Sequence, residues 1–304
     1  MSYIKKVRDP KNEWGKIVKN RLIDMENYKD QWTLIDKFLK KKNRQSNSKN
    51  EMKFYKPNDG IYKVKMHLDE EDSSRIRDML DAELEFNKVC GIKRNILEYK
   101  SETVLPLDDV SSRDKQKILM VFGNPAINSV DKGMFYFSKN PKDGPGGNRK
   151  IFAKHPMWSK LEKAGLIRNV DVNDEDSFKA RKKEAEERKK LILEGSTLNK
   201  CLVGLTTFYS FPTPVTGKYK NVAGVKKVFG QKLLEDIQCE EIKRLQGYEH
   251  FKNAFLIFAQ KSTYEIYKLK VGDSPEVLYW PGVAMMQKGS GGDSLKEILM
   301  GLCI

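Results

Sequence analysis

The stretch ILMVFGNPAINSVDKGMFYFS, residues 118 to 138, organises this chain. Its first five residues are apolar and predict a buried strand, which Gly123, Asn124 and Pro125 end abruptly. A Gly and a Pro at this place predict a sharp turn whose backbone can approach a ligand closely, with the Asn amide projecting from the strand end. Such an amide cannot accept a proton at neutral pH, but its oxygen can orient a water molecule. From these three residues alone, a strand-ending turn with the Asn bonded to its own backbone is the simpler interpretation.

Three other short apolar runs have the same character: CLVGL at 201–205, AFLIF at 254–258 and EVLYW at 276–280. Helical patterns alternate with these runs, at 156–164, 174–193, 225–244, 262–269 and 294–302. The alternation predicts an α/β fold, with three α/β/α layers around a central, mainly parallel four-stranded sheet. Ligands of such sheets bind at the carboxyl ends of the strands, which is where Asn124 falls. The helix at 174–193 is highly charged with nearly balanced signs, so we expect it to be largely solvated.

The amino-terminal part of the chain is strongly basic. The 304 residues carry a net charge of +15, and residues 1–66 alone contain 18 Lys and Arg against 8 Asp and Glu. An apolar period of three to four residues between 14 and 39 predicts one or two helices, the polar segment 40–50 predicts an exposed loop, and a strand at 61–66 precedes a helix at 73–86. We therefore expect a basic, mainly helical region at 1–105 and an α/β domain at 106–304. The charge favours an anionic partner over a merely lysine-rich surface.

Several classes of protein are not supported. The four cysteines, Cys90, Cys201, Cys239 and Cys303, include no C-x-x-C pair, so neither a disulfide framework nor a zinc or iron-sulfur site is expected. A zinc deaminase is excluded because its His and Cys motifs are absent. No apolar stretch approaches the ~18 to 20 residues that span a bilayer, and the first ten residues lack a signal-peptide core. We expect an intracellular, monomeric protein without metal, cofactor or membrane contact, cytoplasmic in a bacterial or virus-infected cell and nuclear in a eukaryote.

The turn and the residues after it resemble a known family in residue type as well as in spacing. Gly133 and Tyr136 lie nine and twelve residues beyond Asn124, and HPMWSKLEKAGLI comes next at 155–167. This arrangement resembles the uracil-DNA glycosylase superfamily, in particular its mismatch-specific, thymine-DNA-glycosylase-like branch and its single-strand-selective branch. In that family the Asn orients the hydrolytic water and the aromatic residue stacks on the extruded base. VGLTTFYSFPTP at 203–214, AFLIFAQKSTYEIY at 254–267 and EVLYWPGVAMMQKGSGGDSLKEIL at 276–299 keep the family's order, so the resemblance covers about 115–304.

The resemblance implies a set of functional residues. Asn124 is the expected catalytic residue. The expected substrate contacts are Gly123, Pro125, Ala126, Gly133, Phe135, Tyr136, Thr206, Trp280 and Gly282. The family has a first motif, here the Gly-Asn-Pro turn, and a second motif, here beginning at Trp280. The expected DNA contacts are Met285, Met286, Gln287, Lys288 and Ser290 in the second-motif loop, with Arg149 and Lys150 beyond the first motif. Phe135 and Trp158 also fit core positions, and His155 fits a helix start.

The chain departs from the family pattern at both motifs. Gly123 adjoins the Asn directly, Ala126 replaces a second Gly, and residues 280–283 lack the expected His or Asn. The implied activity is a monofunctional DNA glycosylase acting in DNA repair or antiviral defence, with single- or double-stranded DNA as partner. Its base would be uracil, mismatched thymine or another modified pyrimidine, including the bulky modified cytosines of phages. Two alternatives remain open: a catalytically inactive DNA-binding protein of the same fold, and a nuclease built on Asp236, Glu241 and Lys243.

Overall fold

The computed structural model describes residues 52–55, 60–107, 115–138, 142–143, 150–170, 177–196, 201–248, 251–281 and 291–302. The chain divides into two units, Met1–Lys49 and Asn50–Ile304. The helices expected within 14–39 and the loop expected at 40–50 lie outside the described residues. All of the described residues belong to the second unit.

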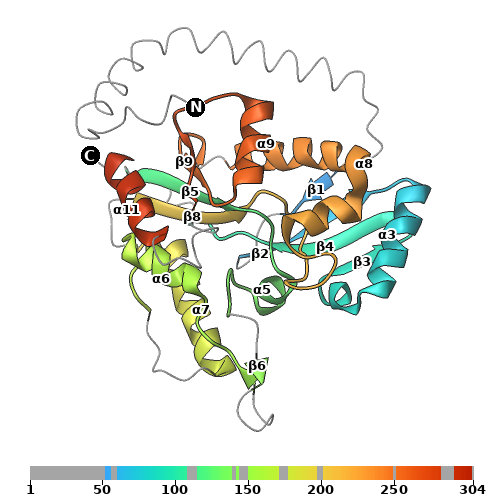
Figure 1. Cartoon of the computed structure of the whole chain (residues 1–304), viewed down its shortest axis with the longest axis horizontal. Coiled ribbons are helices and arrows are strands. Elements are labelled where there is room, and N and C mark those ends of the chain that lie inside the picture. Colours follow the sequence, from blue (N-terminus) through green and yellow to red (C-terminus); the bar gives the residue numbers. More distant parts are fainter. Residues whose placement is uncertain are drawn as a thin grey trace, which may run out of the picture. The chain divides into compact units, whose positions relative to one another are not determined.

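A four-stranded parallel sheet lies at the centre of this unit (Figure 1). Its strands are β5 (Gln116–Phe122), β8 (Cys201–Thr207), β9 (Phe255–Phe258) and β10 (Val277–Tyr279), in the order β10-β9-β5-β8. All three neighbouring pairs run parallel. The four apolar runs therefore form the strands predicted for them, and β5 and β9 occupy the middle of the sheet, where apolar residues on both faces are buried.

Helices flank the parallel sheet, as expected for a mixed α/β fold compatible with three layers. The helices with predicted counterparts are α6 (Pro156–Lys163), α7 (Phe178–Leu193), α8 (Asn221–Gln246), α9 (Lys261–Val271) and α11 (Gly291–Leu302). Side chains of β5 alternate between two cores: Ile118, Met120 and Phe122 pack with α6, α7 and α11, whereas Leu119 and Val121 pack with α8 and α9. A short helix, α5 (Ile127–Lys132), follows the Gly-Asn-Pro turn. Two-residue strands β6 (Lys142–Asp143) and β7 (Lys150–Ile151) form a separate ladder.

A second, antiparallel sheet precedes the parallel one. Its strands are β1 (Met52–Phe54), β2 (Ile61–His67), β3 (Cys90–Lys93) and β4 (Ile96–Glu102), in the order β1-β2-β4-β3, with α3 (Glu70–Ala82) and a 3₁₀ helix (Leu84–Lys88) between β2 and β3. A bridge between Val104 and Leu205 joins this part of the chain to the edge strand β8. The described part of 1–105 thus combines an antiparallel sheet with helices rather than being mainly helical. The strand predicted at 61–66 is confirmed as β2, in which a period of two buries Tyr62, Val64 and Met66 but not the lysines between them.

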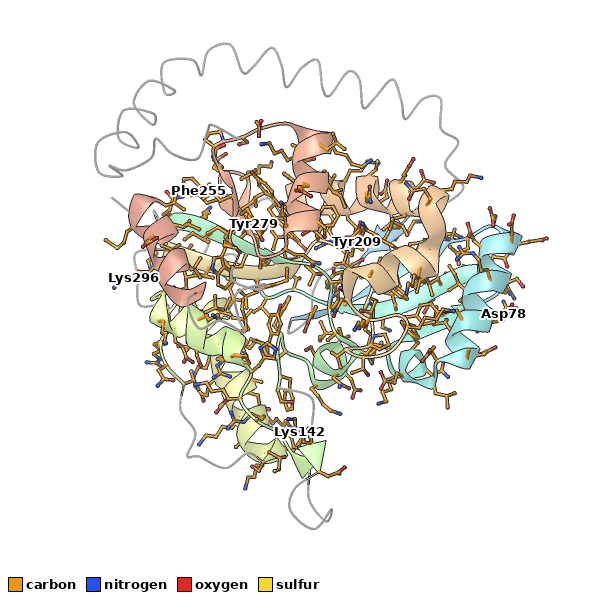
Figure 2. All side chains as sticks on the ribbon, viewed as in Figure 1. Asp78, Lys142, Tyr209, Phe255, Tyr279 and Lys296 are labelled. Atoms are coloured by element: carbon orange, nitrogen blue, oxygen red, sulfur yellow. The ribbon has the colours of Figure 1, made fainter. Side chains whose placement is uncertain are left out.

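Helix α7 is not the solvated helix that its charge predicts. Arg188 and Glu184 are 1% and 0% exposed, and Arg188 Nη1 donates to Glu184 Oε2 at 3.1 Å. Its guanidinium also lies 4.8 Å from the ring of Trp158 in α6. Charges of opposite sign one turn apart can enter a core because they satisfy each other. Figure 2 shows the contrast between interior and surface: Tyr209 lies inside, beside β8 and α8, while Asp78 projects outward from α3.

Candidate active site at the carboxyl edge of the parallel sheet

Asn124 lies two residues beyond the end of β5 and is half-buried rather than sealed in the core. Its Nδ2 donates to Thr213 Oγ1 at 2.7 Å and to the Pro125 carbonyl at 3.0 Å. Both bonds use the amide nitrogen, and no described residue bonds Oδ1. The carboxamide is therefore held in one orientation, with its oxygen available to accept a hydrogen bond from water. The bond to Pro125 fits the simple turn predicted from the sequence, whereas the bond to Thr213 was not foreseen.

The segment that carries Thr213 is fastened to the turn by its backbone. Thr213 N donates to the Pro125 carbonyl at 3.0 Å, and Ile127 N donates to the Thr213 carbonyl at 3.0 Å. Upstream, Tyr209 N donates to the Gly123 carbonyl at 2.9 Å. The chain leaving β8 thus continues the pairing with β5 past the ends of both strands. This pairing places Thr213 beside Asn124 although 89 residues separate them.

A buried ion pair holds the beginning of the same segment. Arg244 Nε donates to Glu241 Oε2 at 2.7 Å, both on α8, and Arg244 Nη2 donates to the carbonyls of Thr207 and Phe208. The other carboxylate oxygen of Glu241 accepts from the hydroxyl of Ser210. Because every one of these groups is enclosed, the pair fixes the path of the chain beyond β8. Glu241 is thereby engaged in structure, which removes the support for a nuclease centre there.

Gly123 is required by a close approach of side chains. A Cβ at this position would lie 2.8 Å from Val222 Cγ2 and would overlap the amide of Gln260. Gln260 immediately precedes α9 and lies at the carboxyl end of β9, and no described residue bonds its side-chain amide. A second carboxamide is therefore placed next to the Gly-Asn turn. Sequence reasoning missed Gln260, although the rule about strand ends points to the residue after AFLIFA.

Tyr136 occupies an uncommon backbone conformation for a bulky residue. Its φ is 48°, in the left-handed region, and Trp158 Nε1 donates to its carbonyl at 3.0 Å. The residue is half-buried, and its ring lies 4.4 Å from the His155 ring and meets Phe122 edge-on at 5.2 Å. Holding a tyrosine at positive φ costs about 1 to 3 kcal/mol, and such outliers gather at functional sites. Burial, with a contribution from the charge of Glu102, raises the pKa of the Tyr136 phenol, so it stays neutral.

The remaining predicted residues near the turn divide into two groups. Pro125, Ala126 and Gly133 lie at the turn and around α5: Ala126 caps the helix at its start, and Gly133 ends it at φ 81°. Three others do not face a ligand. Phe135 and Trp280 are 2% and 0% exposed within the core beneath α6, and Thr206 Oγ1 accepts from Arg244 in the opposite core. Strand alternation and core packing turn these three side chains inward, so each occupies a core position in the described structure.

His155 has the role expected of a helix-start residue. Its Nδ1 accepts a hydrogen bond from Met157 N at 3.2 Å, so it caps α6. An accepting Nδ1 places the proton of a neutral imidazole on Nε2. The imidazole ring of His155 also packs against the ring of Tyr136, so the residue that caps α6 supports the aromatic side chain of the site.

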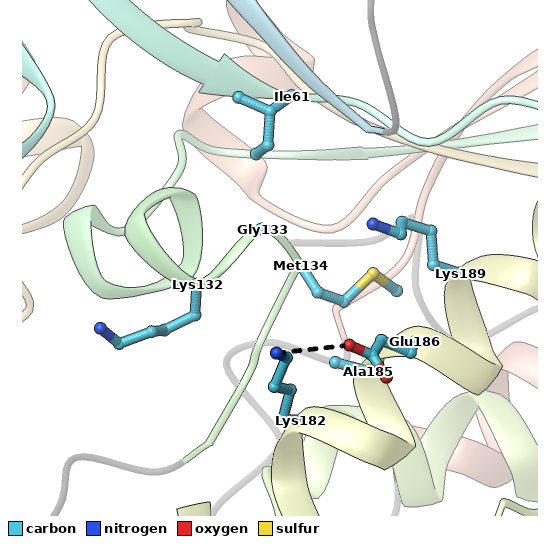
Figure 3. A pocket seen from close by; sticks show the side chains of 8 residues that line it. All are labelled: Ile61, Lys132, Gly133, Met134, Lys182, Ala185, Glu186 and Lys189. Atoms are coloured by element: carbon cyan, nitrogen blue, oxygen red, sulfur yellow. Dashed lines mark ion pairs between the residues drawn. The ribbon is translucent and has the colours of Figure 1, made fainter. Parts of the chain in front are cut away.

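A pocket of about 320 Å³ opens next to Gly133 (Figure 3). Figure 3 shows the residues that line it: Ile61, Lys132, Gly133, Met134, Lys182, Ala185, Glu186 and Lys189. Lys182 lies 3.8 Å from Glu186 on the exposed side of α7. Three lysines against one glutamate make the pocket basic, which favours an anionic ligand.

Other predictions fall on residues whose position is not described. Gly282 and the expected DNA contacts Met285, Met286, Gln287, Lys288, Ser290 and Arg149 lie outside the described residues, and Lys150 is described only as the backbone of β7. Within the described ranges, no group of three or more His, Cys, Asp or Glu side chains is placed to hold a metal ion. No helix in that part of the chain is long and apolar enough to cross a membrane.

Comparisons with protein-family models, with curated proteins and with solved structures find no significant match to this chain.

Proposed function

We propose that this chain is a monofunctional DNA glycosylase, which hydrolyses the N-glycosidic bond of a uracil-like, mismatched or modified pyrimidine extruded from DNA. The observation that carries the proposal is Asn124. It is half-buried at the carboxyl end of a central strand, and its Nδ2 is tied to Thr213 while Oδ1 is left for water. The spacing to Gly133 and Tyr136, which resembles the uracil-DNA glycosylase superfamily, assigns this amide the role of placing the hydrolytic water.

The chemistry of the reaction suits a neutral amide. Cleavage of an N-glycosidic bond passes through a sugar with oxocarbenium character, while negative charge grows on the departing base. A developing cation is electrophilic enough to be attacked by an oriented water without a strong base. Thr213 and the Pro125 carbonyl supply the fixed orientation that makes such a group effective.

The base must first leave the DNA stack, which costs a few kcal/mol. Stacking on an aromatic side chain returns about 1 to 3 kcal/mol per base. Tyr136 is the aromatic residue near the turn that keeps partial exposure, since Phe135 and Phe137 are 2% and 6% exposed. We assign the stacking role to Tyr136. The basic pocket beside Gly133 and the excess of positive charge in residues 1–66 favour contact with phosphates.

One observation favours a second candidate, a DNA-binding protein of the same fold without catalysis. Trp280 takes the place at which the second motif of the family begins, and it is fully buried. Residues 280–283 therefore supply no His or Asn to bond the base. This candidate predicts salt-sensitive DNA binding and no abasic product from any substrate.

The test uses the full chain on single- and double-stranded oligonucleotides that each carry one candidate base: uracil, mismatched thymine, hydroxymethylcytosine or glucosylated cytosine. Alkali then breaks the strand at abasic sites. We expect cleavage of at least one substrate, and about a 10²- to 10³-fold lower rate for Asn124→Ala, as for the loss of one oriented polar group. Asn128→Ala, on the exposed side of α5, is the matched control and should retain the rate. Alkali-labile product from none of these bases would overturn the proposal, as would an unchanged rate in Asn124→Ala.

A further inference from the structure

Two polar side chains near Tyr136 are buried with an atom that lacks a hydrogen-bond partner among the described residues. Glu102, the last residue of β4, is 2% exposed, and Thr207, the last residue of β8, is 1% exposed. Neither Glu102 Oε2 nor Thr207 Oγ1 makes a hydrogen bond. An unsatisfied buried polar group costs about 1 to 3 kcal/mol, so native proteins keep few of them without a reason.

A backbone bridge joins the two segments that carry these side chains. Val104 and Leu205 exchange backbone hydrogen bonds of 2.8 Å as an antiparallel bridge. The bridge is isolated, and Glu102 and Thr207 each lie two residues from it, at the ends of β4 and β8. Side chains two residues apart share a face, so both lie on the face of Val104 and Leu205. Those two residues belong to the same core as Phe122, and Tyr136 packs against that core.

Further contacts place the pair at the site. Thr207 is the direct partner of Phe122 across β5 and β8, and the Phe122 ring meets Tyr136 at 5.2 Å. In its ionised form the Glu102 carboxylate would raise the pKa of the Tyr136 phenol, so the two groups lie within electrostatic range of each other. In the antiparallel sheet, Glu102 of β4 pairs with Ile61 of β2, and Ile61 lines the basic pocket together with Gly133 and Met134. Thr207 is thus linked to Tyr136 through Phe122, and Glu102 is linked through Ile61 to a pocket that opens to solvent.

Burial also disfavours the ionised form of the acid. It raises the pKa of the Glu102 carboxyl well above its ordinary value. A neutral carboxyl group presents one O–H donor and one carbonyl acceptor side by side. The Thr207 hydroxyl can donate or accept. Together they match a flat heterocyclic edge that carries an acceptor next to a donor.

We propose that Glu102 and Thr207 read the hydrogen-bonding edge of the excised base, and that this base is an aminopyrimidine of the cytosine type. The inference rests on the proposed glycosylase function and names its substrate class. The Glu102 O–H donates to ring N3, its carbonyl accepts from the 4-amino group, and Thr207 bonds the O2 side. A cytosine edge offers this acceptor and donor, whereas N3 of uracil carries a hydrogen and accepts no proton.

The acid also has a role in bond cleavage. As the bond between C1′ and N1 breaks, its electron pair stays on the base and Glu102 transfers its proton to N3, so a neutral base departs. The water held by Asn124 forms the new bond to C1′ and releases a proton to solvent, and a solvent proton restores the Glu102 carboxyl. The sum is the addition of one water across the glycosidic bond. General acid catalysis of this kind contributes about 10²- to 10⁴-fold.

The experiment compares Glu102→Gln and Thr207→Val, both nearly isosteric, with wild type. Rates are measured on oligonucleotides containing cytosine-type bases and uracil, and binding of free cytosine, 5-hydroxymethylcytosine and uracil is followed by thermal shift. We expect Glu102→Gln to lower the rate on a cytosine-type base at least about 10²-fold, with unchanged affinity for DNA. Thr207→Val should weaken binding of the same free base. Ser101→Ala is the matched control, because Ser101 is also a buried polar residue of β4 but faces the opposite side of the strand.

The two proposals fail in different ways. Cleavage that prefers uracil, or that is equal in wild type, Glu102→Gln and Thr207→Val, overturns the inference and leaves the glycosylase intact. Binding of a free cytosine-type base that depends on Glu102, without cleavage, supports the inference and overturns the proposed hydrolysis. Absence of both binding and cleavage overturns both. If Glu102→Gln does not fold, Thr207→Val and the binding preference of wild type decide the inference.

Discussion

Two ion pairs are buried on opposite sides of the parallel sheet, and their surroundings differ. Arg244 and Glu241, on α8, bond through all three guanidinium nitrogens and both carboxylate oxygens. Arg188 and Glu184, on α7, leave Arg188 Nε and Glu184 Oε1 without a hydrogen bond. The first pair holds the backbone beyond β8, whereas the second links α7 chiefly to the side chains of α6. A saturated pair therefore positions the site, and an incompletely bonded one packs helices.

The largest expected effect comes from breaking the saturated pair. Arg244→Met leaves Glu241 as an uncompensated buried charge and frees the carbonyls of Thr207 and Phe208. We expect a loss of about 3 to 5 kcal/mol in the free energy of unfolding, measured by urea denaturation. The double variant Glu241→Gln/Arg244→Met should recover part of that loss because no unpaired charge remains. A double variant that is less stable than Arg244→Met would contradict this explanation.

Arg188→Met should have a smaller effect. Glu184 keeps a second cation, Arg181 Nη1 at 3.0 Å, and Met fills much of the space over the Trp158 ring. We expect a loss of about 1 to 3 kcal/mol, the usual cost of an incompletely satisfied buried group. The same denaturation measurement checks it. If Arg188→Met proves as costly as Arg244→Met, the contrast between the two pairs does not hold.

The smallest effect is expected at an exposed pair on the same helix as Arg188. Lys182 and Glu186 are 62% and 61% exposed and lie 3.8 Å apart. Lys182→Met should change the free energy of unfolding by about 0.2 to 1 kcal/mol, because water and salt screen the pair. Raising the ionic strength should remove this difference while leaving that of Arg244→Met largely unchanged.

Local sequence patterns were sufficient to predict the strands of the parallel sheet and the helices that flank it. The runs that became β5, β8, β9 and β10 are apolar on both faces, which is a signal that needs no knowledge of the neighbouring strands. The alternation in β2 is equally local and predicted that strand, whereas β1, β3 and β4 were not predicted within a region assigned mainly to helices. For α7 the charge pattern indicated exposure, because a sequence does not show that a partner such as Glu162 will meet Arg188.

The residues of the candidate site also divide into those that the sequence indicates and those that it does not. Asn124, Gly123 and Tyr136 are recognisable from spacing along one segment. Thr213, Gln260, Glu102 and Thr207 are not, since they come from the ends of three other strands: β8 for Thr207 and Thr213, β9 for Gln260 and β4 for Glu102. Phe135 and Trp280 look like site residues in the sequence and lie in the core. Whether a side chain is buried depends on which face of its strand packs against a helix. That face is set by the packing of the whole fold.

By itself the sequence determined the alternating elements, the strand end that carries a carboxamide and the positive charge of the chain. Each of these depends on residues close together in the chain, where period and turn chemistry act directly. Only the tertiary structure decided what that carboxamide bonds to, which polar groups lack partners and which aromatic residue keeps partial exposure. Those properties arise from contacts between distant segments, and the free energy of such contacts is set by packing rather than by local order.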